Sequence, residues 1–205
     1  AITIAAGTVE LAQSWNTLEN QTLTVAEDAA FVVPSSMTFE LNGTAIVSGT
    51  LTVNGQIILA NKNATLKAVD GLNVTTNIAD YKVVYEGGMY KVVAKVYVAQ
   101  VGSTKYETFA EAMAAAQTGE TIVLLADITL ANAIDITGKT IDLNGKNLKG
   151  NVIGTIRTNG GLYTTAENFK MIGVGADYYK TTDATVVIAN AAITIAAGAV
   201  ELAQS

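Results

Sequence analysis

The chain has 205 residues, of which 50% are hydrophobic and 15% are charged, and its net charge is −6. This length and apolar content allow one large domain or two small ones, each with a buried core. Acidic residues outnumber basic ones, and the basic residues form no stripe along the sequence. This argues against nucleic acid and anionic membrane surfaces as partners.

The residue types that are missing narrow the chemistry further. The chain contains no cysteine and no histidine. Disulfides, thiol nucleophiles and cysteine-ligated metals are therefore excluded, and the commonest general base is absent. No signal peptide and no apolar run of 18 residues is found, so we expect no membrane insertion. We also expect no cofactor, and we interpret the chain either as processed or as a window of a longer one.

Short apolar runs fill the region from Leu23 to Val69 at intervals of six to eight residues. Polar and glycine-containing turns such as Asn42-Gly43 separate them. A β-sandwich places its turns 8–12 residues apart, so the tighter spacing favours an all-β solenoid whose coils stack on one another. The same close spacing of short apolar runs returns from residue 121 onward. The segments 38–43 (TFELNG) and 140–145 (TIDLNG) are also alike, which indicates a shared coil design.

Residues 81–93 read YKVVYEGGMYKVV, in which two copies of YKVV flank a Glu-Gly-Gly turn. This arrangement predicts a β-hairpin. We expect its tyrosines, Tyr81, Tyr85 and Tyr90, to serve packing.

One segment departs from the strand rhythm. Thr108 and Glu111 have the spacing of a capping box, and an alanine-rich run follows that ends before Gly119. These features predict a short helix at about 108–118. Such a helix could cover the open end of a β-solenoid, where exposed strand edges would recruit other chains.

Residues 95–130 resemble a module common in large secreted and cell-surface proteins of anaerobic bacteria and some archaea. The positions that fit its pattern are Val101-Gly102, Thr104, Tyr106, Thr108, Glu111-Ala112, Gly119, Thr121, Leu124-Leu125, Asp127 and Leu130. Residues 140–150 are similar to an early coil of that family, and residues 81–95 to the hairpin that closes the preceding module. The resemblance implies a right-handed parallel β-helix with a small helical cap, a surface or structural role, and no catalytic residues. It divides the chain into residues 1–94, coils ending in a closing hairpin, and residues 95–205, the next module.

The two ends of the chain share a sequence. Residues 1–14 (AITIAAGTVELAQS) match residues 192–205 (AITIAAGAVELAQS) at every position except Thr8, which corresponds to Ala199. An ordinary coil repeat does not explain the match, because coils recur every 20–50 residues and conserve only core positions. The segments could be equivalent positions of a tandem array with a 191-residue period. Alternatively, one end could complete a neighbouring subunit by strand exchange.

Candidate residues for enzymatic chemistry are sparse. Asp135 and Asp142 could form a carboxylate pair if their coils stack, as glycoside hydrolysis requires. A polysaccharide lyase would need a carboxylate cluster beside Arg157, the single arginine, or beside a lysine. Solvated or turn-capping carboxylates explain these residues more simply, so we do not expect an enzyme.

Surface chemistry offers two further candidate sets. Four Asn-x-Thr sequons could carry glycans: Asn20, Asn42, Asn63 and Asn73. Four aromatic residues could contact a glycan: Trp15, Tyr163, Tyr178 and Tyr179.

The favoured hypothesis is a structural, non-enzymatic repeat module of an extracellular filament, fibre, sheath or surface layer. It would assemble end to end by stacking of β-strands, with copies of itself as partners. The alternative is an adhesin or glycan-binding stalk on the cell surface, and a polysaccharide lyase is a remote third possibility.

Overall fold

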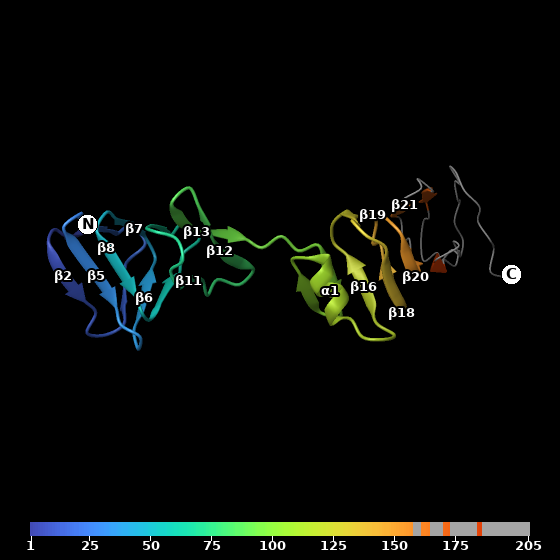
Figure 1. Cartoon of the computed structure of the whole chain (residues 1–205), viewed down its shortest axis with the longest axis horizontal. Coiled ribbons are helices and arrows are strands. Elements are labelled where there is room, and N and C mark those ends of the chain that lie inside the picture. The colour runs from blue at the N-terminus through green and yellow to red at the C-terminus, as the bar shows by residue number, and fades with distance from the viewer. Residues whose placement is uncertain (158–160, 165–169, 173–183, 186–205) are drawn as a thin grey trace. The chain divides into compact units, whose positions relative to one another are not determined.

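The structure is a computed structural model that describes residues 1–157, 161–164, 170–172 and 184–185 (Figure 1). The fold is all-β, with a β-solenoid of about eight turns and a single short helix, which confirms the fold class expected from the sequence. The chain divides into two compact units, Ala1–Lys95 and Val96–Ser205.

Three walls enclose the first unit, and successive strands of the chain pass from one wall to the next. The first wall contains β1 (Ile2–Ile4), β4 (Thr22–Val25), β7 (Thr44–Val47) and β10 (Thr65–Lys67). The second contains β2 (Gly7–Glu10), β5 (Ala29–Val33) and β8 (Thr50–Val53). The third contains β3 (Trp15–Asn16), β6 (Thr38–Leu41), β9 (Gln56–Leu59) and β11 (Val74–Thr75). Within each wall these strands pair in parallel. We call residues 1–17, 18–41, 42–60 and 61–78 the first, second, third and fourth coils.

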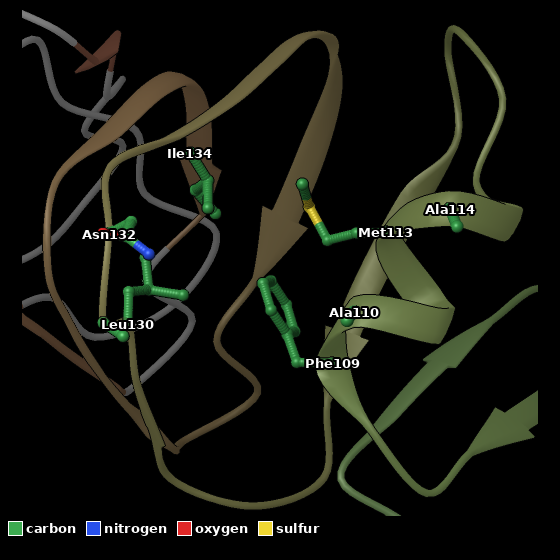
Figure 2. A pocket seen from close by; sticks show the side chains of 8 residues that line it. Phe109, Ala110, Met113, Ala114, Leu130, Asn132 and Ile134 are labelled. Carbon is green, nitrogen blue, oxygen red and sulfur yellow. The ribbon is translucent and has the colours of Figure 1, made fainter.

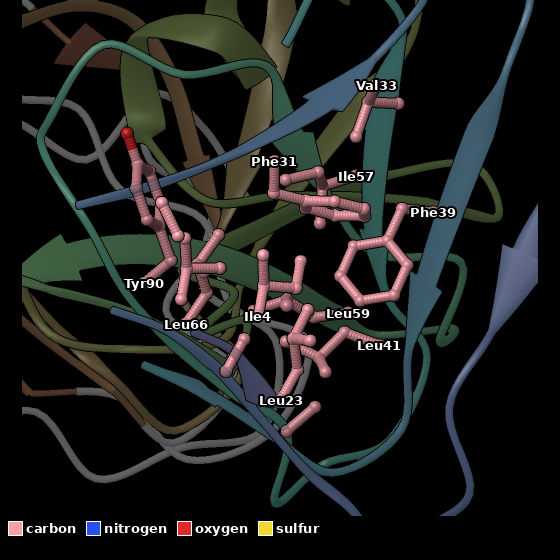
Figure 3. Packing of buried hydrophobic residues seen from close by; sticks show 14 residues of the cluster. Ile4, Leu23, Phe31, Val33, Phe39, Leu41, Ile57, Leu59, Leu66 and Tyr90 are labelled. Atoms are coloured by element: carbon pink, nitrogen blue, oxygen red, sulfur yellow. The ribbon is translucent and has the colours of Figure 1, made fainter. Parts of the chain in front are cut away.

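Alternation along each strand sends every second side chain into the space between the walls. The buried, inward-facing side chains of the second coil are Leu23, Val25, Ala29, Phe31, Val33, Phe39 and Leu41. The rings of Phe31 and Phe39 meet edge to face, with centroids 5.3 Å apart (Figure 3). Side chains of neighbouring coils stack on these residues and form one continuous core.

The corners of the coils explain why glycine recurs in the turns. In the second coil, the Gln21 amide donates to the Leu18 carbonyl (3.0 Å) and closes a four-residue turn. Gly43 of the third coil lies directly on this turn, where a Cβ atom would collide with the Gln21 carbonyl oxygen. Gly49 and Gly55 lie equally close to carbonyl groups at the other two corners of the second coil. The third coil therefore fits the second only because these positions carry no side chain.

A hairpin ends the parallel stack of the first unit, as the sequence predicts. It consists of β12 (Tyr81–Glu86) and β13 (Met89–Ala94), and β13 pairs antiparallel with β10. Gly87 and Gly88 form its turn with φ values of 61° and 78°, a region that glycine occupies without strain.

The three tyrosines of the hairpin are buried to different extents. Tyr90 is buried in the core, where its hydroxyl oxygen accepts a hydrogen bond from the Leu72 amide (2.8 Å). Burial raises the pKa of Tyr90. The Tyr85 ring lies against the Tyr90 ring, with centroids 4.8 Å apart, although Tyr85 itself is exposed. Tyr81 is half-buried.

The second unit starts with an antiparallel arrangement and continues as a solenoid. β14 (Ala99–Val101) pairs antiparallel with both β15 (Thr104–Tyr106) and β16 (Thr121–Leu124). The remaining strands are β17 (Ile128–Thr129), β18 (Ile134–Asp142), β19 (Asn147–Lys149), β20 (Val152–Arg157), β21 (Leu162–Thr164), β22 (Lys170–Ile172) and β23 (Ala184–Thr185). Parallel pairing runs through β16, β18 and β20 in one wall and β17, β19 and β21 in another.

The predicted helix is present as α1 (Phe109–Ala115), and its capping box with Thr108 and Glu111 is formed. Its end differs from the prediction of about residue 118. Ala116 is already extended, and the Gln117 amide donates to the Glu120 carboxylate (2.7 Å) instead of continuing the helix. Gly119 belongs to the turn that leads into β16. Ala112 and Ala116 are buried in the core of the second unit, so the helix packs over that core.

The two similar segments share one structural device. The Asn42 side-chain amide donates to the Thr17 carbonyl (2.9 Å), and that of Asn144 donates to the Leu124 carbonyl (3.1 Å). Each asparagine thus bonds to backbone that lies 25 or 20 residues earlier in the chain. The glycines that follow these asparagines are required for different reasons. A Cβ at Gly43 would collide with a backbone carbonyl, whereas Gly145 has a φ of 72° and open space where a Cβ would lie.

Candidate assembly interface

The first coil provides the terminal strand of all three walls in the first unit. β1, β2 and β3 each pair on one side only, with β4, β5 and β6 respectively. On the other side they meet no strand in the described part of the chain. Backbone donors and acceptors of three neighbouring strands therefore point toward the same open end, where they can pair with a further coil.

The inward-facing side chains of this coil are covered from one side only. Val9 stacks on Phe31 in register, yet 42% of Val9 is exposed, whereas Phe31 is 1% exposed. Trp15 lies on Phe39 with its ring nearly parallel (centroids 5.2 Å apart, interplanar angle 13°), and it is half-buried. Its opposite face has no ring partner among the described aromatic contacts. The open end of the solenoid therefore presents apolar surface that one more coil would cover.

Polar contacts fix the register of the first coil on the second. The Ser14 hydroxyl accepts a hydrogen bond from the Thr38 amide (3.0 Å). The amide of Thr17, which is fully buried, donates to the Glu40 carbonyl (2.9 Å), and the Thr17 hydroxyl accepts from the Asn42 amide (2.9 Å). The coil is thus a defined part of the solenoid with a specific alignment.

Thr8, the position that differs between the two end segments, lies on the outside of this coil. It is exposed, and it pairs in register with Ala30, which also faces outward. Residues 192–205 lie outside the described residues, so their equivalence to residues 1–14 stays a prediction.

The opposite end of the first unit has a different character. β12, the last strand of its wall, carries exposed charges at Lys82 and Glu86. Lys91 forms an ion pair with Glu86 and holds the pKa of that carboxyl below its usual value. Charged side chains on an edge strand disfavour pairing with another sheet. The hairpin therefore protects this end of the first wall, whereas β8 and β11 end the second and third walls with no further strand among the described residues.

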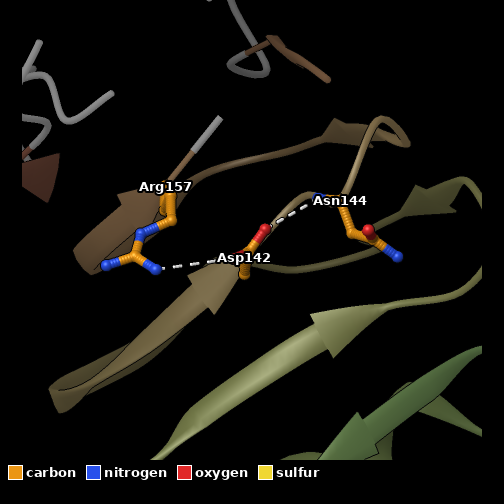
Figure 4. Close-up of polar contacts among 3 residues, drawn as sticks. All are labelled: Asp142, Asn144 and Arg157. Atoms are coloured by element: carbon orange, nitrogen blue, oxygen red, sulfur yellow. Dashed lines mark hydrogen bonds and ion pairs between the residues drawn. The ribbon is translucent and has the colours of Figure 1, made fainter. Parts of the chain in front are cut away.

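The carboxylates considered for catalysis both lie on β18, but each closes a local turn. Asp135 accepts from the amide and hydroxyl of Thr137 (2.8 and 2.7 Å), which lowers its pKa. Asp142 accepts from the Asn144 amide (2.9 Å), and the Arg157 guanidinium lies 3.8 Å from its other oxygen (Figure 4). Within the described residues, no group of three or more acidic side chains could hold a metal ion. The arrangement favours the turn-capping interpretation.

An apolar groove of about 500 Å³ lies beside the cap helix in the second unit. Phe109 and Met113 of α1 line one side, and Leu130 and Ile134 line the other (Figure 2). The side chain of Asn132 is its only polar lining group. The groove thus offers an almost wholly apolar packing surface.

The four sequon asparagines differ in accessibility. Asn20, Asn63 and Asn73 are exposed, and Asn42 is half-buried. The side-chain amides of Asn42 and Asn73 donate hydrogen bonds of 2.9 and 3.0 Å to carbonyl groups of preceding coils. Attachment of a glycan at either of the latter two would compete with a bond that holds coils together, so Asn20 and Asn63 are the better acceptors.

The aromatic candidates do not form one site. Trp15 borders a small pocket of about 140 Å³ that is also lined by Ser14, Asn16, Thr38 and Glu40. Tyr163 is buried in the core of the second unit (1% exposed), and its hydroxyl accepts from the Val152 amide (3.3 Å). A ring in that position cannot stack on a glycan, which corrects the expectation for Tyr163. Tyr178 and Tyr179 lie outside the described residues.

Sequence reasoning did not single out Val9 or the asparagines that link coils. Val9 lies among small residues, and only the register with Phe31 reveals that it faces inward. The similarity of the segments ending in Asn42-Gly43 and Asn144-Gly145 was the available signal for the second feature.

Comparison with protein-family models, with curated proteins and with solved structures finds no match for this chain. In the described part of the structure, no helix has the length and apolar character needed to span a membrane.

Proposed function

We propose that the chain is a structural, non-enzymatic repeat module of an extracellular filament, sheath or surface layer. The observation that carries this proposal is the edge of the first coil, where no described strand pairs with the outer sides of β1, β2 and β3 and where the inward-facing Val9 is 42% exposed. The family resemblance of residues 95–130 supports the extracellular location.

Assembly would proceed by stacking of coils. A further coil about 4.8 Å from β1, β2 and β3 would form hydrogen bonds along all three walls at once. It would also bury the exposed parts of Val9 and Trp15. Because each repeat of a solenoid contacts only its neighbours, stability would grow with every stacked unit.

A cell-surface adhesin is the second candidate. The pocket beside Trp15, with Glu40 and Asn16 in its lining, combines an aromatic ring with polar groups in the way that glycan sites do. A glycan array with the wild-type chain and a Trp15→Ala variant tests this function. Binding that depends on Trp15 would favour it, and an array without hits would remove it.

Electron microscopy and light scattering of the purified chain test the assembly function. We expect concentration-dependent filaments whose axial repeat contains one module. Val9→Asp should abolish them, because it places a charge on the inward face of the open end. Thr8→Asp is the matched control, since the side chain of Thr8, next to Val9, faces outward and should tolerate the same charge. Monomers at every concentration would contradict the proposal.

A further inference from the structure

We propose that the second wall of the first unit binds an extended segment of a partner protein as an additional β-strand, along the free edge of β8. The bound segment carries apolar side chains at alternate positions and an acidic side chain between them. This site lies at the opposite end of the wall from β2. It therefore goes beyond the proposed function and does not depend on assembly at the first coil.

The fourth coil is one strand short. Its first-wall strand is β10 and its third-wall strand is β11, but residues 68–73, all of which the structure describes, connect these two without forming a strand. The second wall therefore ends at β8, whereas the first and third walls continue for at least one more strand. An open strand edge of this kind is where extended peptides add to a sheet.

Burial in the third coil shows the consequence of the missing strand. Ala45 on the first wall and Ile57 on the third wall are 0% exposed, because β10 and β11 pair over them. Leu51 and Val53 on the second wall also pack against the core, yet they are only half-buried. Phe31, the register partner of Leu51 on β5, is 1% exposed. The inward surface of β8 thus lacks the cover that one more strand would supply.

Backbone groups of β8 are directed toward the open side. The Asn54 amide donates to the Val33 carbonyl (2.9 Å), next to β8 and on the β5 side. Because backbone groups alternate in direction along a strand, those of Thr52 also face β5, and those of Leu51 and Val53 face away from it. β8 has the sequence TLTV and lacks the charged side chains that protect edge strands from pairing.

A pocket of about 250 Å³ adjoins this edge. Leu51, Val69 and the ring of Tyr85 are among its lining residues, and Val69 is 69% exposed. Lys67 is the only charged residue in the lining, and it has no ion pair among the described residues. The pocket therefore favours an apolar side chain, and Lys67 favours an acidic residue beside it.

The charge distribution of the first unit also favours an acidic occupant at this end. Residues 1–60 contain five acidic residues and no basic one, whereas residues 61–95 contain five lysines and three acidic residues. Described segments of this chain with the apolar–acidic–apolar pattern, such as residues 39–41 and 134–136, already form strands of their own walls. The bound segment therefore belongs to another protein.

Fluorescence anisotropy with labelled peptides tests the site on the full chain. The probe is the peptide Ser-Thr-Val-Glu-Val-Thr-Ser, and the same peptide with lysine in place of glutamate is its control. The lysine peptide should bind about tenfold more weakly than the glutamate peptide, because it places a like charge beside Lys67. Lys67→Glu should reverse this preference. Lys149→Glu is the matched control, since it changes an exposed lysine of the second unit and should leave the preference unchanged.

Hydrogen exchange measured by NMR locates the contact at single amides. Binding of the glutamate peptide should slow exchange at the amides of Leu51 and Val53, which face the open side. The Thr52 amide, which faces β5, should change little. Val53→Pro should abolish binding, because it removes an open amide and leaves the bonds to β5 in place. Lys67→Glu tests the site even if Val53→Pro fails to fold, because Lys67 is exposed.

Three results would overturn the inference. The first is absence of binding by the glutamate peptide, and the second is equal affinity for the two peptides in the wild-type chain. The third is loss of self-association in folded Val53→Pro, which would assign the edge to another copy of this chain. None of them decides the proposed function, because the Val9→Asp and Thr8→Asp variants test the first-coil end separately.

Discussion

The first and second coils have inward-facing residues of the same kind but differ sharply in burial. Val9 and Phe31 occupy equivalent positions of adjacent coils, and their exposed fractions are 42% and 1%. Among the described residues, the second coil has a neighbour on each side, whereas the first has one. In a solenoid, an apolar side chain becomes core only when both neighbouring coils are present, so the end coil behaves as half of an interface.

The largest expected effect separates these two coils. Phe31→Ala should lower the free energy of unfolding by about 3–5 kcal/mol, because it leaves a cavity beside Phe39. Val9→Ala should cost about 1 kcal/mol or less in the monomer, since much of Val9 is already exposed. Urea unfolding followed by fluorescence of Trp15, the only tryptophan, measures both. If both variants lost the same free energy of unfolding, Val9 would have to be as well covered in solution as Phe31.

A second comparison concerns the glycines in the two similar segments. Gly43→Ala should destabilise the first unit by about 2–3 kcal/mol, because the added Cβ collides with the Gln21 carbonyl. Gly145→Ala should cost about 1 kcal/mol in the second unit, because only its left-handed backbone conformation is penalised. Thermal unfolding followed by circular dichroism provides the measurement. A larger loss for Gly145 than for Gly43 would contradict the corner packing.

The hydrogen bond between Asn42 of the third coil and Thr17 of the first coil provides a third test. Asn42→Ala removes the hydrogen bond from its side chain to the Thr17 carbonyl and should cost about 1 kcal/mol. Hydrogen exchange should then accelerate in residues 1–17, since that bond helps to hold the first coil. Asn63→Ala serves as the control because Asn63 is exposed, and it should leave exchange unchanged. Identical exchange in both variants would exclude a holding role for Asn42.

The smallest effect is acid sensitivity of the second unit. The Asp127 carboxylate accepts from the amide and side chain of Asn147 in the next coil (2.8 and 3.0 Å), and these bonds lower its pKa. The folded state then holds fewer protons than the unfolded state, so this stabilisation is present above about pH 4 and is lost as the pH falls through the lowered pKa. Asp127→Asn should flatten the fall in urea midpoint between pH 5 and pH 3. An unchanged slope would assign the acid sensitivity to other carboxyls.

The sequence predicted the solenoid, the hairpin and the cap helix because each has a local signature. The spacing of apolar runs, the Gly87-Gly88 turn and the Thr108–Glu111 capping box act within a few residues. The helix end was misplaced because the backbone leaves the helix at Ala116 and the Glu120 carboxylate binds the Gln117 amide, a choice that alanine content does not reveal.

The candidate interface was less accessible to sequence reasoning, since it depends on the register between coils. The match between the two ends of the sequence pointed to residues 1–14, but not to which of them face inward. Tyr163 was misjudged for the same reason, because its burial depends on strands that are distant along the chain.

The corner glycines also constrain how such a protein can grow by gene duplication. The third coil fits the second because Gly43, Gly49 and Gly55 lie on three four-residue turns. A duplicated third coil would place these glycines on its own two-residue corners and lose that fit. Lengthening by single coils is therefore disfavoured, and duplication of a whole run of matched coils preserves every corner. The 191-residue array predicted from the sequence would copy such a whole run of coils.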